Sequence, residues 1–365
     1  MKKLLLATTM LITAGNYAAA DVAVSGDARM GIVSTDGESR LTSRVRISFS
    51  GSGTTDGGLA FGGSVRADNS TGGAAGTSGA VYLSGAFGKL SMGDVDSADS
   101  AAVGQLAGVG YTGLGDSNEV QYSADGFSLF DLDKDLLAAA KEYNDRSTTN
   151  TDDYAAKSLT VTSPASKVLY TYTAGSLSAS ASASQIGDYQ SYAVGASYAT
   201  GALTLAAGYG SSEVNVADDV TTSTAAWEGN GDVTDTTAAA SYVMGTTTLK
   251  AIYQDKQFEG TSTSNNDATL TETSYGASVQ HKMDAITVTG FGITADLHDG
   301  IFGDDDLTLA RYGVGASYDL GGGATLAGGV ARIESANVAY GSSATEIIDS
   351  TESQTVFDIG VNFSF

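Results

Sequence analysis

The segment Val356–Phe365 alternates strictly between apolar and polar side chains. Its apolar positions are Phe357, Ile359, Val361, Phe363 and Phe365, and its polar positions are Asp358, Gly360, Asn362 and Ser364. Successive side chains of a β-strand point to opposite faces, so the segment predicts a strand with one apolar and one polar face. In a soluble sandwich a turn would normally follow, whereas this strand ends on an aromatic residue. The pattern favours a strand that closes a barrel in a membrane.

Residues 1–20 have the pattern of a secretory signal peptide. Lys2 and Lys3 form a basic start, residues 4–15 are apolar, and Ala18–Ala20 form a small-residue exit. The apolar stretch is shorter than the roughly 20 residues that a transmembrane helix needs. We therefore expect export and cleavage before Asp21. Because no later segment has the length of a spanning helix, membrane insertion would have to use strands.

The composition agrees with a protein built from strands. The chain contains 47 glycines but a single proline, as expected for strands joined by glycine turns. It has no cysteine, so an exported fold needs a constraint other than disulfides. A closed hydrogen-bonded ladder would supply that constraint.

The formal net charge is −24. This excess of acid argues against nucleic acid and anionic lipid surfaces as partners. Runs of Asp at 152–153, 218–219 and 304–306 indicate solvated loops that attract cations. Carboxylate clusters can bind Ca²⁺, but none of these runs has the spacing of a calcium loop, so a metal site stays open. No other cofactor is expected.

Amphipathic runs recur along the whole chain. The first three cover residues 22–32, 44–50 and 59–66, and their polar faces carry Arg29, Arg44, Arg46 and Arg66. Further runs lie near 79–86, 89–94, 167–173, 177–184, 190–199, 202–210, 236–243, 246–255, 273–281, 285–294, 311–318 and 324–332. If the apolar faces meet lipid, the four arginines point into the barrel.

The connections between these runs differ strongly in length. Seven are tight, at 54–58, 87–89, 174–176, 200–202, 244–246, 282–285 and 319–323, and longer polar connections lie between them. Seven hairpins with a first and a last strand predict an all-β, sixteen-stranded antiparallel barrel over residues 21–365. Short turns on one rim and long loops on the other are typical of outer-membrane barrels. An even count lets the first and last strands pair antiparallel, which removes the sheet edges.

The stretch from about Val95 to Ala165 does not alternate. Within it, Asp135–Tyr143 predicts a short helix, and Asn118–Tyr122 with Phe127–Phe130 predicts a small hairpin. We expect a folded excursion between two strands, because a connection of this length without structure of its own is uncommon.

Several motifs resemble those of the general diffusion porins of alphaproteobacteria, the Rhodobacter type, in the same order along the chain. They are Asp27–Gly31, Ser50–Leu59, Tyr82–Asp94, Val109–Leu114, Leu169–Gly175 and Gly315–Gly323. The resemblance implies a trimeric outer-membrane barrel with short periplasmic turns, long external loops and a third long loop folded into the lumen. That loop would be the excursion at about 95–165.

The resemblance implies a water-filled channel for passive diffusion of small hydrophilic solutes and ions. It also implies that a basic wall and an acidic loop face each other at a constriction. The basic candidates are Arg29, Arg44, Arg46 and Arg66, and the acidic candidates are Asp96, Asp99, Asp116 and Glu119. The arginines alone would favour anions, whereas the excess of acid predicts a weak cation preference overall.

The expected partners follow from the same resemblance. They are outer-membrane lipid and lipopolysaccharide, further copies of the chain in a homotrimer, and the barrel-assembly machinery. Phe363 and Phe365 would form the signal that this machinery reads. Val22, Val24 and Phe363 are expected at the trimer contact.

No enzymatic chemistry is expected. Only His281 and His298 are present, without cysteine, which is too few ligands for a zinc site and gives no oriented base for a serine. Two other classes of function remain open. One is a substrate-specific outer-membrane channel, and the other is a secreted β-rich surface protein.

Overall fold

The structure is a computed structural model that describes residues 21–70, 77–126, 159–162, 167–218, 229–262, 267–299, 305–340 and 347–365. The predicted signal peptide, the helix predicted at 135–143, Phe127–Phe130 and the Asp run at 152–153 lie outside these residues. The runs at 218–219 and 304–306 are described in part, because Asp218 ends a strand and Asp305 begins one. Among these described residues, one α-helix, α1 (Ala98–Val103), and one 3-10 turn, η1 (Ser123–Asp125), accompany the strands. The strands are β1 (Asp21–Thr35), β2 (Glu38–Thr54), β3 (Ala60–Ser70), β4 (Thr77–Gly85), β5 (Gly88–Gly93), β6 (Leu159–Thr162), β7 (Val168–Ala174), β8 (Leu177–Ile186), β9 (Tyr189–Thr200), β10 (Leu203–Asp218), β11 (Gly229–Met244), β12 (Thr247–Ser262), β13 (Asp267–Met283), β14 (Ile286–Asp299), β15 (Asp305–Gly321), β16 (Ala324–Tyr340) and β17 (Ile347–Ser364).

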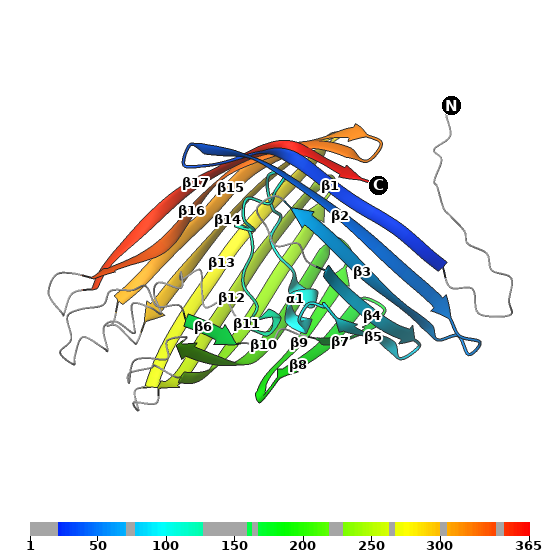
Figure 1. The fold of residues 1–365 in the computed structure, drawn as a ribbon, viewed down its shortest axis with the longest axis horizontal. Helices are drawn as coiled ribbons and strands as arrows, with labels where there is room; N and C mark the ends of the chain where they lie inside the picture. Colours follow the sequence, from blue (N-terminus) through cyan, green and yellow to red (C-terminus); the bar gives the residue numbers. More distant parts are fainter. Residues whose placement is uncertain are drawn as a thin grey trace.

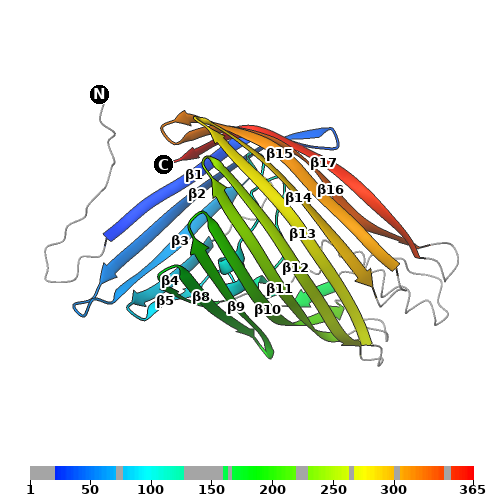
Figure 2. The same ribbon diagram turned by 180° about the vertical axis from the view of Figure 1, so that it is seen from behind.

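Sixteen of the strands close into one antiparallel barrel, as predicted (Figures 1 and 2). β5 pairs directly with β7, and β6 is a short addition that pairs with the end of β10. β1 pairs with β17 from Asp27 opposite Ser364 to Thr35 opposite Val356, which closes the ring. No helix among the described residues is long and apolar enough to cross a membrane.

The alternation of β17 divides its side chains between the two faces of the wall. Phe357 and Ile359 are each 44% exposed on the outer face, whereas Asp358 between them is 0% exposed on the inner face. The same parity holds on β1 and β2, where Met30 and Val45 are exposed apolar side chains. The outer face therefore forms the apolar band that contacts lipid in a membrane barrel.

All seven predicted tight turns join consecutive strands at one rim. At the opposite rim, the expectation of long connections is wrong in two places. Asp36–Gly37 joins β1 to β2, and Gly187–Asp188 joins β8 to β9. Asp36 and Gly37 both have positive φ, as in a type I′ hairpin, and Gly187 has positive φ at the first turn position. The Asp-Gly and Gly-Asp pairs in the sequence were the signals for these turns.

The chain after β5 folds into the barrel, as predicted for the third long loop. Figure 1 shows α1 and the cyan chain around it inside the ring of strands. At α1, Ser182 Oγ accepts the N–H of Ala98 at 2.9 Å, and Ser180 Oγ donates to the carbonyl of Ala98 at 2.9 Å. The chain then crosses to β17, where Asp358 accepts the backbone N–H groups of Tyr111 and Thr112 at 3.2 and 2.7 Å.

After Thr112 the chain returns toward β11, where residues 123–125 are anchored on that strand and on the start of the loop. Asp235 accepts the backbone N–H of Ser123 at 2.7 Å. The side chain of Asp125 accepts the N–H of Ser97, so the two ends of this path are joined. We refer to residues 94–126 as the lumen loop.

Glycines in the strands let the lumen loop approach the wall. A Cβ at Gly208 would lie 2.5 Å from the Cβ of Asp99, and a Cβ at Gly315 would lie 3.0 Å from the N of Gly110. Neither position has room for a larger residue without movement of the loop. These strand glycines therefore form a surface on which the lumen loop docks. The composition had suggested glycines in turns, and this is a second role for glycine.

The apolar core lies inside the barrel, between the lumen loop and the inner wall. From the loop it contains Val103, Leu106, Val109, Tyr111, Leu114, Val120 and Tyr122, and from the strands Val33, Ile252, Phe291, Ile293, Ala327, Ala331 and Val356. Full burial of a side chain such as Leu114 contributes about 1.5–3 kcal/mol. The lumen loop is thus held by a core of its own as well as by polar contacts.

The hairpin strand predicted at Asn118–Tyr122 is wrong, because the structure has no strand there. The side-chain amide of Gln105 replaces a partner strand, donating to the carbonyl of Val120 and accepting its N–H, each at 2.8 Å. α1 was not predicted, since six residues are too few to show a helical period.

Asp99 on α1 is the most deeply buried carboxyl of the lumen loop, with 0% exposure. Its Oδ2 has no hydrogen-bond partner, and near Gly210 it converges with Oδ1 of Asp235. Burial, and then the charge of Asp235, raise the pKa of Asp99 to about 7. The charge of Asp125 also raises the pKa of Asp99. On the neighbouring strand β12, Lys256 lies directly opposite Asp235.

Docking of α1 should therefore weaken as the pH rises from about 4 to about 7. An exposed aspartic acid has a pKa of about 3.9, so the docked state binds the proton more tightly than the undocked state does. The stabilisation is complete below the lower pKa and is lost as the pH passes the higher one. Hydrogen exchange of the α1 amides, corrected for intrinsic rates and compared at pH 5 and pH 8.5, should show lower protection at pH 8.5.

Asp99→Asn should reduce this pH dependence, because one titrating group is removed, while burial also raises the pKa of Asp125 beside Ser97. Asp96→Asn is the matched control, since Asp96 lies three residues away and is exposed. Equal pH dependence in the wild type and in Asp99→Asn would contradict the role of Asp99.

Candidate functional site

Four arginines form a basic wall on the inner face of three adjacent strands. Arg29 is on β1, Arg44 and Arg46 are on β2, and Arg66 is on β3. Arg29 and Arg44 are directly opposite each other in the β1–β2 ladder. The structure therefore brings together all four of the basic residues predicted from the sequence.

Carboxylates of the same wall pair with three of these arginines. Arg44 Nη2 lies 3.1 Å from Asp27 Oδ1. Asp68 bridges two arginines, with Oδ2 at 3.0 Å from Arg46 Nε and Oδ1 at 2.7 Å from Arg66 Nε. Sequence reasoning placed the screening carboxylates on the loop and missed both aspartates. The signal was present, because Asp27 and Asp68 lie two residues from Arg29 and Arg66, on the same face of each strand.

Arg29 connects the basic wall to the lumen loop. Its Nη1 donates to the carbonyl of Thr112 at 3.2 Å, and its guanidinium lies 6.0 Å from the ring centroid of Tyr111. Asp116 is within electrostatic range of the same guanidinium. One edge of the loop is thus fixed beside the arginines.

The four predicted acidic residues lie in different environments. Asp96 and Asp116 are exposed, and Glu119 is partly buried. Burial and the charge of Asp116 raise the pKa of Glu119, while Arg311 opposes the rise. Asp99 is buried against β10, so the structure does not bring it to the lumen surface or to the arginines.

Other residues that position the loop were not predicted. Arg311 on β15 donates to the carbonyl of Glu119 at 3.0 Å, and Lys250 on β12 donates to the carbonyl of Val103 at 2.6 Å. Both face inward, and only strand parity could have indicated this. His281 Nδ1 lies 2.8 Å from Thr247 Oγ1, and the described residues contain no group of three acidic, His or Cys side chains that could hold a metal ion.

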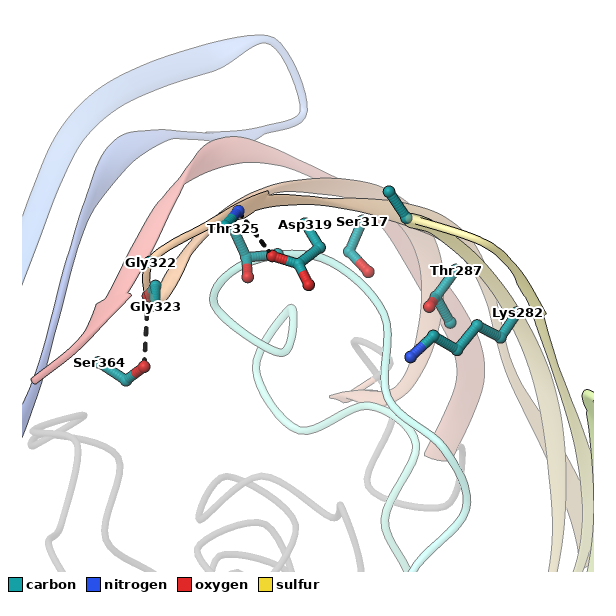
Figure 3. Close-up of a pocket in the computed structure, with 10 residues that line it drawn as sticks. Lys282, Thr287, Ser317, Asp319, Gly322, Gly323, Thr325 and Ser364 are labelled. Atoms are coloured by element: carbon teal, nitrogen blue, oxygen red, sulfur yellow. Dashed lines mark hydrogen bonds between the residues drawn. The ribbon is translucent and has the colours of Figure 1, made fainter. Parts of the chain in front are cut away.

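The inner wall is also polar near the short turns. A recess there has a volume of about 410 Å³. Lys282, Thr287, Ser317 and Asp319 line it (Figure 3). Its other side is formed by the glycine turn between β15 and β16, where the N–H of Gly321 donates to Asp319 Oδ1 at 2.8 Å. Hydrophilic side chains therefore line the lumen at this end as well as at the basic wall.

Comparison with known proteins gives a consistent result. The family model for the Gram-negative porins matches residues 7–338. A porin of Rhodobacter capsulatus is 34% identical over 363 residues, which is 94% of this chain and 100% of that protein.

Comparison with solved structures also indicates the porin fold. A porin refined at 1.8 Å resolution has a TM-score of 0.61 at 30% identity and covers 94% of this chain and 100% of its own. The trimer form of OmpT, an outer membrane protein of Vibrio cholerae, has a TM-score of 0.65 at 15% identity over 95% and 100% of the two chains, and shares the fold. The chain therefore belongs to the Gram-negative porins and is an integral β-barrel channel of the outer membrane, not an enzyme.

Proposed function

We propose that the basic wall and the exposed carboxylates of the lumen loop form the constriction of this channel. The observation that carries the proposal is the position of Arg29, Arg44, Arg46 and Arg66 on one inner sector, in contact with the loop through Thr112. Small hydrophilic solutes and ions would pass between this sector and Asp96 and Asp116. A transverse field at this point would orient dipolar solutes and discourage apolar ones.

The channel is proposed to prefer cations weakly. The chain carries a net charge of −24, and Asp96 and Asp116 are exposed beside the path. Fixed charges act over about one Debye length, ~10 Å at 0.1 M salt, so a water-filled pore would show a small preference.

Replacing Arg29, Arg44 and Arg66 together by Gln should raise both the cation preference and the single-channel conductance. Positive charge and bulk leave the narrow section, and the nearby carboxylates remain. We expect the cation-to-anion permeability ratio to increase about two- to fivefold. The measurement is the reversal potential across a salt gradient in planar bilayers.

Arg332→Gln is the matched control, because Arg332 on β16 is exposed and lies on the outward-facing parity. It should leave the reversal potential unchanged. Identical potentials for the wild type and the triple variant would place the three arginines outside the constriction.

A substrate-specific channel is the alternative within the same family. Block of conductance that saturates with the concentration of a sugar or a dicarboxylate would favour it. A linear dependence on concentration favours general diffusion.

We propose that the protein is a homotrimer in contact with outer-membrane lipid and lipopolysaccharide. A spanning strand needs about 9–11 residues, but β5 has 6 and β7 has 7. A second copy of the chain would cover the part of the wall that these two short strands form. Val22, Val24 and Phe363 are further candidates, since both valines are exposed on the outer face near the barrel seam.

The trimer predicts unequal labelling of two valines of similar exposure. Val81 on β4 is 60% exposed and Val314 on β15 is 53% exposed. Because the chain has no cysteine, Val81→Cys and Val314→Cys each introduce a single thiol. In membranes, a lipid-soluble maleimide should label Val314→Cys and spare Val81→Cys. A monomeric mass by light scattering in mild detergent, or equal labelling, would contradict the proposed trimer.

We propose that Phe363 and Phe365 are part of the signal read by the barrel-assembly machinery. Phe365 extends the β17–β1 ladder, donating to the carbonyl of Gly26 at 3.0 Å and accepting its N–H at 2.7 Å. Its side chain is exposed, so a partner could reach it.

Deletion of Phe365 should lower the amount of heat-modifiable barrel in the outer membrane several-fold and leave export unchanged. Phe365→Tyr is the control, because it keeps an aromatic ring and the ladder. Equal amounts of inserted barrel for the wild type and the deletion would count against the assembly role.

A further inference from the structure

The basic wall carries its own counter-charges. Among the described residues, Arg44, Arg46 and Arg66 form ion pairs with Asp27 or Asp68, on the same three strands. Within the described part of the lumen loop, no carboxylate forms an ion pair with any of the four arginines. The screening of Arg44, Arg46 and Arg66 is therefore a property of the wall.

Strand register places these acids beside the arginines, although only Arg46 and Asp68 pair directly across a ladder. Asp27 pairs with Arg44, the diagonal neighbour of its ladder partner, and Arg66 pairs with Asp68 two residues further along β3. Asp27 on β1 is directly opposite Arg46 on β2, and Arg46 is directly opposite Asp68 on β3. Opposite charges facing each other across neighbouring strands stabilise the sheet by roughly 0.2–1 kcal/mol per pair. The acids are thus interleaved with the arginines across the whole sector.

The geometry of Asp68 fixes the direction of two guanidinium groups. Its two oxygens bind the Nε atoms of Arg66 and Arg46, at 2.7 and 3.0 Å. A guanidinium held at Nε cannot swing freely into the lumen. Asp68 is 18% exposed and Asp27 is 45% exposed, so both also contribute negative charge to the water path.

We propose that Asp27 and Asp68 determine the ion selectivity of the channel. Four arginines and two aspartates leave a wall charge of +2 where the arginines alone would give +4. Asp27 and Asp68 thereby lower the barrier to cations and hold the guanidinium groups against the wall. This assignment rests on the proposed constriction, because it concerns the same sector.

The double variant Asp27→Asn with Asp68→Asn should lower the cation-to-anion permeability ratio about two- to fivefold at 0.1 M salt. The effect should shrink at 1 M salt, where the Debye length falls to about 3 Å. Asp68→Glu retains the charge and should retain the wild-type ratio. Asp56→Asn is the control for net charge, since Asp56 is exposed in the turn between β2 and β3.

Asp27→Asn alone provides a second variant if the double variant does not fold, because Asp27 has one arginine partner and is the more exposed acid. It should shift the reversal potential in the same direction by a smaller amount. An unchanged ratio in variants that conduct would overturn the assignment and leave the channel function intact. Absence of conductance in the wild type would instead overturn the proposed constriction and this assignment together.

Discussion

Closure of the backbone ladder between β1 and β17 is the constraint on which the rest of the structure depends. In hydrocarbon no water is available for unpaired N–H and C=O groups, so a sheet can cross only without open edges. The register that closes the ring, with Asp27 opposite Ser364, also sets the parity of every side chain near the seam. A slip of one residue would turn Asp358 toward lipid and Phe357 toward water.

Closure also positions the lumen loop. The backbone of Tyr111 and Thr112 is held by Asp358 on the closing strand, and Thr112 in turn accepts a hydrogen bond from Arg29 on the first strand. A Cβ at Gly31 or Gly360, opposite each other in the seam, would lie within 3 Å of the Tyr111 ring. The docked position of the loop therefore depends on contacts from both strands of the seam, which couples the pore geometry to closure of the barrel.

Period-two alternation was sufficient to predict the strands, their number and the inward direction of the arginines, because lipid on one face and water on the other leave a strong pattern. The lumen loop could not be predicted in the same way. Its backbone is satisfied by single side chains, by Gln105 within the loop and by Asp235 and Asp358, which lie far away in the sequence. The carboxylates at the basic wall were missed although parity had already placed them beside the arginines, and Asp99 was expected in water although it is buried against Gly208.

The pairing of charges within one wall changes the direction of the field. A guanidinium beside a carboxylate on a neighbouring strand forms a short dipole along the wall, and its field decays faster across the lumen than that of an isolated charge. Asp96 and Asp116 on the loop are then left with part of their negative charge unopposed. An arginine-rich wall is for this reason compatible with a channel that favours cations. The sign of the ion preference follows from which carboxylates are paired with arginine and which are not.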